Sequence, residues 1–242
     1  MSKARDLYRS MRRRIQRATR RPGVGRVDLG DLDRLTPISR NWGFDRGQPI
    51  DRFYIERFVE ARAADIRGRV LEVSNNEYTR RFGGERVTRS DILHPFGGNP
   101  RATVIADLAR PEPRLEQQFD CIICTQTLPF IYEARAAVQQ LHDWLKPGGV
   151  ALVTVPGISQ VSREDMRLTG DYWRFSSVAV RLMFADAFGA GTLEIGSWGN
   201  VLAAIALLHG IAAEEIGQAD LLEVDPEFEL ITTVRAVRGK PS

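Results

Sequence analysis

From Gly68 onward the sequence alternates between short apolar segments and helical segments, and this alternation restricts the fold more than any other feature. Five apolar segments are predicted to be strands: residues 69–73, 86–91, 102–107, 119–124 and 150–155. Helices are predicted over 133–145 and 178–188, and two more strands near 193–198 and 229–237. Continuous apolar strands separated by helices indicate a parallel sheet that is covered on both faces. We therefore predict an α/β fold with a doubly wound sheet of about seven strands.

The segment Phe119–Cys124 is the most hydrophobic of these strands, so we expect it at the centre of the sheet. Its two cysteines, Cys121 and Cys124, lie three residues apart and should point to opposite faces. They can then neither form a disulfide nor chelate a metal without rearrangement. We interpret them as buried core thiols, which is typical of a reducing compartment and predicts a cytoplasmic location.

The chain has 242 residues, 43% of them hydrophobic, which is enough for one large α/β domain but not for two. The sequence has no run of 18 apolar residues, so we expect no membrane span. Its N-terminus lacks the apolar core of a signal peptide, so we do not expect export. We expect a basic helix and linker over 1–28, a cap segment with a helix over 29–66, and the main domain over 67–242. Asp51 is the expected N-cap of the helix in the cap segment, which should run to Asp65.

Positive charge is concentrated at the N-terminus. Residues 1–26 contain ten Lys and Arg residues and one acid, a net charge of +9, whereas the remaining chain carries −6. Leu7, Met11 and Ile15 recur every four residues and predict a basic amphipathic helix. Such a helix can bind an anionic membrane surface (at the inner membrane face), nucleic acid or a protein partner, or stay solvated. Nucleic acid is disfavoured because aromatic residues are not interleaved with the arginines; vesicle co-sedimentation with and without residues 1–26 tests the membrane hypothesis.

Polar residues lie at or just after the ends of four predicted strands, where the neighbouring residues are apolar. In a doubly wound sheet, ligands bind beyond the carboxyl ends of the strands. A carboxylate that ends the second strand can accept both hydroxyls of a ribose, and one that ends the third can accept an adenine amino group. The pattern therefore predicts a nucleoside site. Its residues, in chain order, are Glu72, Ser74, Asn75, Asp91, Asp107, Thr125 and Gln126.

At these positions the chain resembles the class I S-adenosylmethionine-dependent methyltransferases, in particular the small-molecule branch called type 11. The resemblance runs from Arg67 to about Arg238. It is carried by Val70-Leu-Glu-Val, Asp91, Ala106-Asp-Leu, Phe119-Asp-Cys-Ile-Ile, Leu145-Lys-Pro-Gly-Gly and Gly170-Asp-Tyr-Trp-Arg-Phe. It implies a Rossmann-like sheet whose last strand is antiparallel, with S-adenosylmethionine as the cofactor. The cofactor residues it implies are Glu72, Ser74, Asn75, Asp91, Ile92, Asp107, Leu108, Thr125 and Gln126.

The first loop departs from the family's pattern of an acid followed by three spaced glycines. Those glycines let the backbone approach the methionine end of the cofactor closely. Here the loop reads Glu72-Val-Ser-Asn-Asn-Glu-Tyr, with no glycine. Asn75 and Asn76 tolerate a left-handed backbone better than most residues, so the turn itself remains possible. The sequence does not decide whether the pocket is reshaped or closed.

Aromatic and charged residues before and after the central strands are the expected acceptor site. Their mixture suits a small hydroxylated acceptor such as a sugar or glycan precursor, although the same residues could serve only as packing and ion pairs of a lid. They are Trp42, Asp45, Arg46, Asp171, Tyr172, Trp173 and Arg174.

Three hypotheses on function follow. The first is O-methylation of such an acceptor, with no metal and with the catalytic base not identified. The second is a non-catalytic methyltransferase fold that serves as a binding or scaffold protein, which the glycine-free loop motivates. The third is a dinucleotide enzyme, which is disfavoured because no Gly-x-Gly-x-x-Gly follows any strand. The acceptor, the atom methylated and the oligomeric state stay open.

Overall fold

The computed structural model describes Met11, Ile15 and residues 22–239, and the chain divides into two compact units, Met1–Thr36 and Pro37–Ser242. In the first unit, residues 22–36 are almost all exposed and form one short 3-10 helix, η1 (Gly30–Leu32). The predicted basic helix lies outside the described residues apart from Met11 and Ile15, so it stays a prediction.

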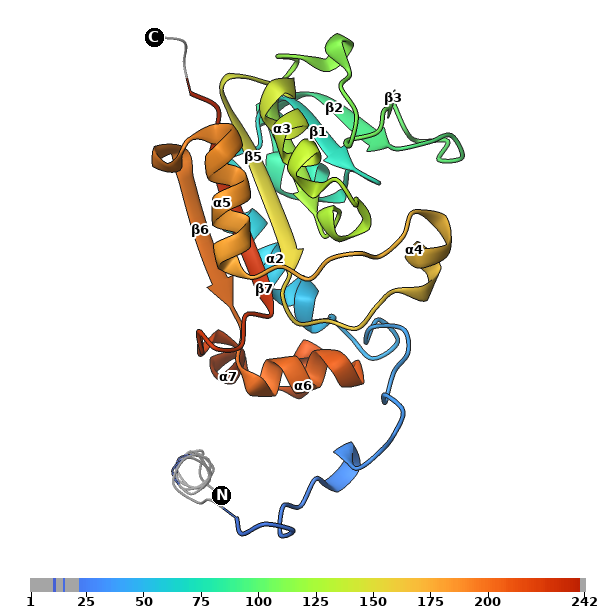
Figure 1. The fold of residues 1–242 in the computed structure, drawn as a ribbon, viewed down its shortest axis with the longest axis vertical. Helices are drawn as coiled ribbons and strands as arrows, with labels where there is room; N and C mark the ends of the chain where they lie inside the picture. The colour runs from blue at the N-terminus through green and yellow to red at the C-terminus, as the bar shows by residue number, and fades with distance from the viewer. Residues whose placement is uncertain (1–10, 12–14, 16–21, 240–242) are drawn as a thin grey trace. The chain divides into compact units, whose positions relative to one another are not determined.

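The second unit is built on a seven-stranded sheet in the order β3-β2-β1-β4-β5-β7-β6 (Figure 1). The first five strands along the chain are parallel, and β7 lies antiparallel between β5 and β6. The prediction of seven strands with the last one antiparallel is confirmed. The strands are β1 (Gly68–Val73), β2 (Val87–His94), β3 (Val104–Ile105), β4 (Phe119–Thr125), β5 (Leu145–Pro156), β6 (Leu193–Trp198) and β7 (Ile231–Val237).

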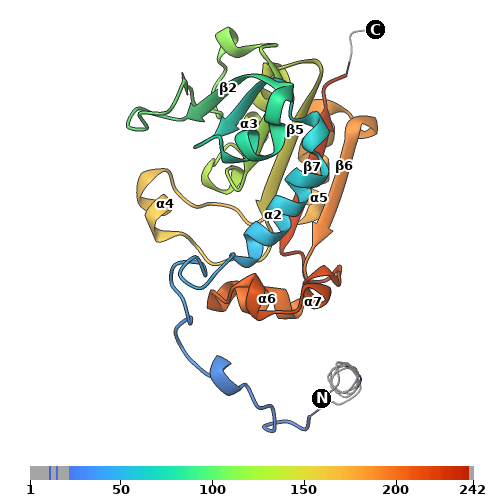
Figure 2. The same cartoon turned by 180° about the vertical axis from the view of Figure 1, so that it is seen from behind.

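Helices cover both faces of this sheet. Helices α3 and α5 lie on one face, and α2 lies on the other (Figures 1 and 2). The α-helices are α2 (Ile50–Ala61), α3 (Ala134–Trp144), α4 (Arg163–Leu168), α5 (Ser177–Phe188), α6 (Val201–His209) and α7 (Gln218–Leu222). Short 3-10 and π turns lie in the connections between these helices and strands. They are η2 (Ala63–Asp65), the π-turn η3 (Thr79–Gly83), η4 (Gly84–Arg86), η5 (Pro113–Leu115), η6 (Leu128–Phe130), η7 (Ala190–Thr192) and η8 (Ala213–Glu215). None of the helices described has the length and apolar character needed to cross a membrane.

The central strand is β4, as its hydrophobicity predicts. Cys124 packs in the core under α3 and α5, whereas Cys121 packs in the core under α2, so the two thiols do lie on opposite faces. Both are free and fully buried. Burial raises the pKa of both thiols, that of Cys124 to about 12, because the thiolate would lose its hydration.

Three predicted boundaries were wrong. Strand β2 continues three residues beyond Asp91, to His94, so Asp91 lies inside the strand. Strand β3 is only two residues long and ends before Asp107. Helix α2 begins at Ile50 after Pro49, so Asp51 lies in its first turn instead of capping it. Helix α6 was not predicted: its residues are apolar on nearly all sides and give no amphipathic period.

Residues 37–49 form the part of the predicted cap segment that precedes α2 in the second unit, and from here on we call them the cap segment. They are hydrogen-bonded to the region around the end of α6. The Ser39 amide donates to the His209 carbonyl at 3.0 Å, and the Ala213 amide donates to the Gln48 carbonyl at 2.8 Å. Gly210 ends α6 with a left-handed backbone, φ +66°, and lies against Ser39. The cap segment is therefore held by residues some 170 positions away in sequence.

We expect Gly210→Ala to lower the free energy of unfolding by about 1–3 kcal/mol, because the residue needs a left-handed backbone and a tight approach. An added Cβ would stand 2.6 Å from the Ser39 carbonyl oxygen. Urea unfolding measures the change. Gly191→Ala is the control, since a Cβ there meets nothing within 4 Å; equal effects from the two variants would contradict this account.

Candidate functional site

A cavity of about 1330 Å³ opens at the carboxyl edge of the sheet. Residues at or just after the ends of β1, β2, β3, β4 and β5 line it. The chain order of the strands reverses between β1 and β4, and this is where doubly wound sheets bind ligands. The other walls come from the cap segment, the start of α2, and the stretch 157–174 after β5, which we call the strap.

The first loop keeps the backbone turn of the glycine motif without its glycines. Ser74 stands at the position of the first glycine and has φ +70°, in the left-handed region that glycine favours. Its amide donates to the Leu93 carbonyl at 2.9 Å, and the Asn75 side chain accepts from the Glu77 amide at 2.9 Å. Ser74 and Asn75 both line the cavity, so the loop leaves it open.

Glu72 fastens this loop from inside. Its carboxylate accepts hydrogen bonds from the amides of Tyr78 and Thr79, at 3.1 and 2.8 Å, and from the Thr79 hydroxyl at 2.7 Å. Only 3% of Glu72 is exposed. Burial raises the pKa of the carboxyl above its ordinary value, and the hydrogen bonds from Thr79 and Tyr78 partly oppose that rise. The amides at the start of η3 are therefore satisfied by the protein itself.

Asp91 lies outside the cavity, inside a charged cluster between β1 and β2. Its carboxylate accepts from the Arg69 guanidinium at 2.7 Å and from the Thr103 hydroxyl at 2.9 Å, and it pairs with Arg89 at 3.1 Å. Burial alone would raise the pKa of Asp91, but these hydrogen bonds outweigh it and hold the pKa below its ordinary value. The neighbouring Ile92 is buried and does not reach the cavity either. The geometry does not bring these two residues to a ribose.

His94, at the end of β2, lines the cavity where the acid was expected. Its Nδ1 lies 2.5 Å from the Phe96 carbonyl oxygen, and because a carbonyl only accepts, Nδ1 carries the proton. Phe96, Asp107 and Leu108 line the same part of the cavity. Apolar and aromatic side chains beside a carboxylate suit a purine ring with an exocyclic amino group.

Thr125 and Gln126 line the cavity next to the first loop. Gln126 has φ +51°, and its amide donates to the Thr154 carbonyl at 2.9 Å. The chain thus turns sharply at the end of β4, with the turn hydrogen-bonded to β5.

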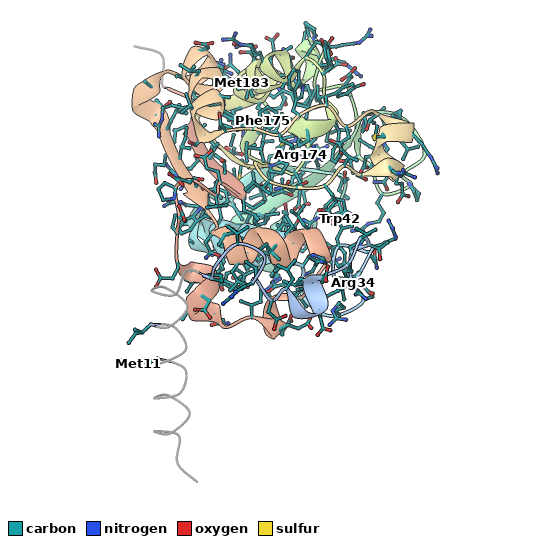
Figure 3. All side chains as sticks on the ribbon, turned by 60° about the horizontal axis from the view of Figure 1, so that its bottom comes forward. Met11, Arg34, Trp42, Arg174, Phe175 and Met183 are labelled. Atoms are coloured by element: carbon teal, nitrogen blue, oxygen red, sulfur yellow. The ribbon has the colours of Figure 1, made fainter. Side chains whose placement is uncertain are left out.

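The strap supplies most of the expected acceptor site. Asp171 and Arg174 form an ion pair at 2.6 Å, and Arg174 also donates to the carbonyls of Ser159 and Gln160. Burial would raise the pKa of Asp171, but the hydrogen bonds from Arg174 and the Ser162 amide lower it below its ordinary value. Tyr172 lines the cavity with them. Arg174 lies in the strap and Trp42 in the cap segment, and both line the cavity (both are labelled in Figure 3).

Three expected acceptor residues do not line the cavity, because each has a partner elsewhere. Asp45 accepts from the Ser39 hydroxyl within the cap segment. Arg46 pairs with Glu215 in η8 at 2.5 Å. The indole of Trp173 donates to the Ile131 and Tyr132 carbonyls at 3.1 Å and fastens the strap to the start of α3.

Several cavity residues were missed from the sequence. The most informative are Asp51 and Arg52 at the start of α2, Tyr78 after the first loop, and Asp165 in α4. Asp51 and Arg52 follow Pro49 and Ile50 in the sequence, but we interpreted Asp51 only as a helix N-cap and so did not assign it to the site. Asp165 gave no signal, because α4 was not predicted.

The model of a methyltransferase domain matches residues 38–189, more than half of the chain. The chain belongs to this methyltransferase-domain family. S-adenosylmethionine is the cofactor of that family. No curated protein matches the sequence.

Solved structures share the fold at low sequence identity. The [4+2]-cyclase SpnF is 16% identical with a TM-score of 0.52, over 81% of this chain and 85% of that one. The CMeT domain of the citrinin polyketide synthase is 14% identical with a TM-score of 0.52, over 80% of this chain and 54% of that one. The N-methyltransferase NodS from Bradyrhizobium japonicum WM9 is 13% identical with a TM-score of 0.47, over 79% and 98%. A cyclase among them illustrates that a shared fold does not fix the reaction.

The residues present fit S-adenosylmethionine. Ser74 provides a left-handed turn after β1, and the cavity has room for a nucleoside and an acceptor together. Asp107 lines it between the apolar residues Ala106 and Leu108. Carboxylates outnumber cationic side chains along the wall, which favours a ligand that carries a sulfonium and an ammonium group.

We expect Asp91→Asn to lower the free energy of unfolding by about 1–3 kcal/mol at pH 7, because the charged cluster loses its anion. The folded pKa of Asp91 is depressed, so its contribution is present above the unfolded pKa of about 3.9 and is lost as pH falls further. The difference between variant and wild type should therefore shrink below about pH 4 in urea titrations. Cofactor affinity of the folded variant should change less than about threefold (0.6 kcal/mol); a hundredfold loss would mean that Asp91 contacts the ribose.

Proposed function

We propose that this protein is a cytoplasmic methyltransferase that methylates an oxygen of a small hydroxylated acceptor, such as a sugar or glycan precursor. The observation that carries the proposal is the open cavity at the switch point. Asp107 and apolar side chains in its lining suit a nucleoside, and polar and aromatic side chains of the strap suit a hydroxylated acceptor. The alternative of a scaffold role rests on a glycine-free first loop that closes the pocket. The loop leaves the pocket open, so that alternative is not favoured.

The acceptor end suits hydroxyl groups. Ser159 and Gln160 of the strap line the cavity, and the side-chain oxygen of Gln160 is buried without a hydrogen-bond partner among the described residues. An unsatisfied buried acceptor favours a ligand that donates hydrogen bonds. Tyr132 and Tyr172 at the rim are 62% and 48% exposed and offer flat apolar faces to a ring.

S-adenosylmethionine, when bound, supplies an electrophilic methyl group. The chain must then position the acceptor oxygen and remove its proton. Of the carboxylates in the strap, Asp171 is occupied by Arg174, whereas the carboxylate of Asp165 makes no ion pair or hydrogen bond with another described residue. Asp165 is partly buried and lines the cavity, so we assign it as the general base.

Isothermal calorimetry with S-adenosylmethionine and S-adenosylhomocysteine, followed by transfer of a labelled methyl group to a panel of sugars, tests the proposal. We expect dissociation constants in the micromolar range, about −8 kcal/mol, and label in a product that releases no methylamine on hydrolysis. Tight cofactor binding with label only on nitrogen would refute O-methylation. No binding at millimolar cofactor would refute the methyltransferase assignment and restore the scaffold hypothesis.

Asp165→Asn should lower kcat for methyl transfer by about 10²–10⁴-fold, the usual contribution of general-base catalysis, and leave S-adenosylhomocysteine affinity unchanged. Single-turnover transfer measures the first quantity and calorimetry the second. Glu164→Gln is the matched control, because Glu164 is the exposed neighbour on α4 and does not line the cavity. Equal rates for the two variants would exclude Asp165 as the base.

Residues 1–26 carry a separate prediction. Binding of an anionic membrane surface or a protein partner through this segment stays a hypothesis, since most of the segment, including nearly all of the predicted basic helix, lies outside the described residues.

A further inference from the structure

The backbone amides of residues 77–80, where the chain enters η3, cannot hold a ligand carboxylate in the way a helix N-terminus usually does. Free backbone amides at such a terminus are the ordinary anion site. Here the amides of Tyr78 and Thr79 donate to Glu72, that of Glu77 donates to the Asn75 side chain, and that of Arg80 to the Asn76 carbonyl. All four amides are taken by the protein. An α-amino acid bound beside this loop therefore needs charge partners other than these four amides.

Three arginines line the cavity, and two of them are already paired. Arg81 forms an ion pair with Glu56 at 2.7 Å, and Arg174 forms one with Asp171 at 2.6 Å. Arg52 has no ion pair with a described residue. It lies in the first turn of α2, and its Nη1 donates to the Tyr78 hydroxyl at 3.1 Å. A guanidinium has five N–H donors in a fixed plane, so this contact orients the group and leaves donors for a carboxylate.

Asp51 stands next to Arg52 and also lines the cavity. Its Oδ1 accepts from the Arg52 amide at 2.8 Å, and the carboxylate has no ion pair with a described residue. Burial raises the pKa of Asp51 above its ordinary value, since the charged form has lost much of its hydration. The adjacent Arg52 guanidinium opposes this rise only in part, so a further cation beside the carboxylate would be favourable.

The Asp51 carboxylate and the Arg52 guanidinium belong to adjacent residues at the start of α2, next to the first loop. Tyr78, which replaces the last glycine of the family's motif, connects them to that loop through its hydroxyl. A carboxylate next to a guanidinium matches the ammonium and carboxylate groups of an α-amino acid.

We propose that Arg52 binds the α-carboxylate and Asp51 the α-ammonium of the methionine portion of the cofactor. Side chains of α2 thereby bind the charged groups that backbone amides of a glycine-rich loop would otherwise bind. The inference rests on the use of S-adenosylmethionine proposed above and assigns the subsite that recognises its amino-acid end.

Two probes isolate that end. S-adenosylhomocysteine carries the amino acid, and 5′-methylthioadenosine has the same nucleoside and sulfur without it. We expect wild type to bind S-adenosylhomocysteine more tightly. Arg52→Gln and Asp51→Asn should each weaken S-adenosylhomocysteine binding at least tenfold in calorimetry, with 5′-methylthioadenosine affinity within twofold of wild type. The two affinities should then approach each other.

Matched variants separate recognition from folding. Arg57→Gln changes an exposed arginine of the same helix that does not line the cavity, and both affinities should stay at the wild-type value. Tyr78→Phe removes only the hydroxyl that orients Arg52, and its loss of S-adenosylhomocysteine affinity should be smaller than that of Arg52→Gln. Parallel loss of both probes in Arg52→Gln, or unchanged S-adenosylhomocysteine affinity, would overturn the proposal. If wild type binds neither probe, the proposed function itself fails.

Discussion

The buried carboxylate of Glu72 determines the form of the site. Its three hydrogen bonds to Tyr78 and Thr79 fix the turn after β1 and the direction of the chain that leaves it. The same bonds use the amides that a ligand would otherwise bind. The loop can therefore lose its glycines and still turn, with Ser74 in the left-handed region, because its geometry is set by a side chain under it. The charged groups of the cofactor's amino-acid end must then be bound by another element. Helix α2 contacts the loop through the hydrogen bond between Arg52 and Tyr78.

That helix is positioned by two segments that are distant in sequence. The cap segment leads into α2, and it is held by hydrogen bonds to His209, Ala213 and Glu214 in the stretch between β6 and β7. Arg46 and Asp45 belong to this attachment and not to the acceptor site. The cavity is thus enclosed by the cap segment, the start of α2 and the strap, while the carboxyl ends of the central strands provide its floor.

Much of the fold could be predicted, because strand–helix alternation and the hydrophobicity of β4 are local properties. The placement of Cys121 and Cys124 on opposite faces follows from strand geometry alone, and the structure confirms it. Asp91 was misplaced because its partner Arg69 lies on another strand, 22 residues away, and no local pattern reveals that pairing. Asp51 was interpreted by a local helix-start rule, yet Pro49 precedes the helix and leaves the Asp51 carboxylate at the cavity wall. Loop residues that follow strand ends were the most predictable part of the site, since sheet topology alone brings them together.

The position of β7 has a consequence for how the chain acquires its structure during synthesis. β7 follows every other strand in the sequence, yet it lies between β5 and β6 and provides the described pairing of β6. The five parallel strands can associate as they emerge from the ribosome, but β6 must wait for residues 231–237. Until then the open edge of β5 is available for pairing with another chain. The order of translation therefore leaves a temporary aggregation-prone edge beside the strand that forms part of the cavity floor.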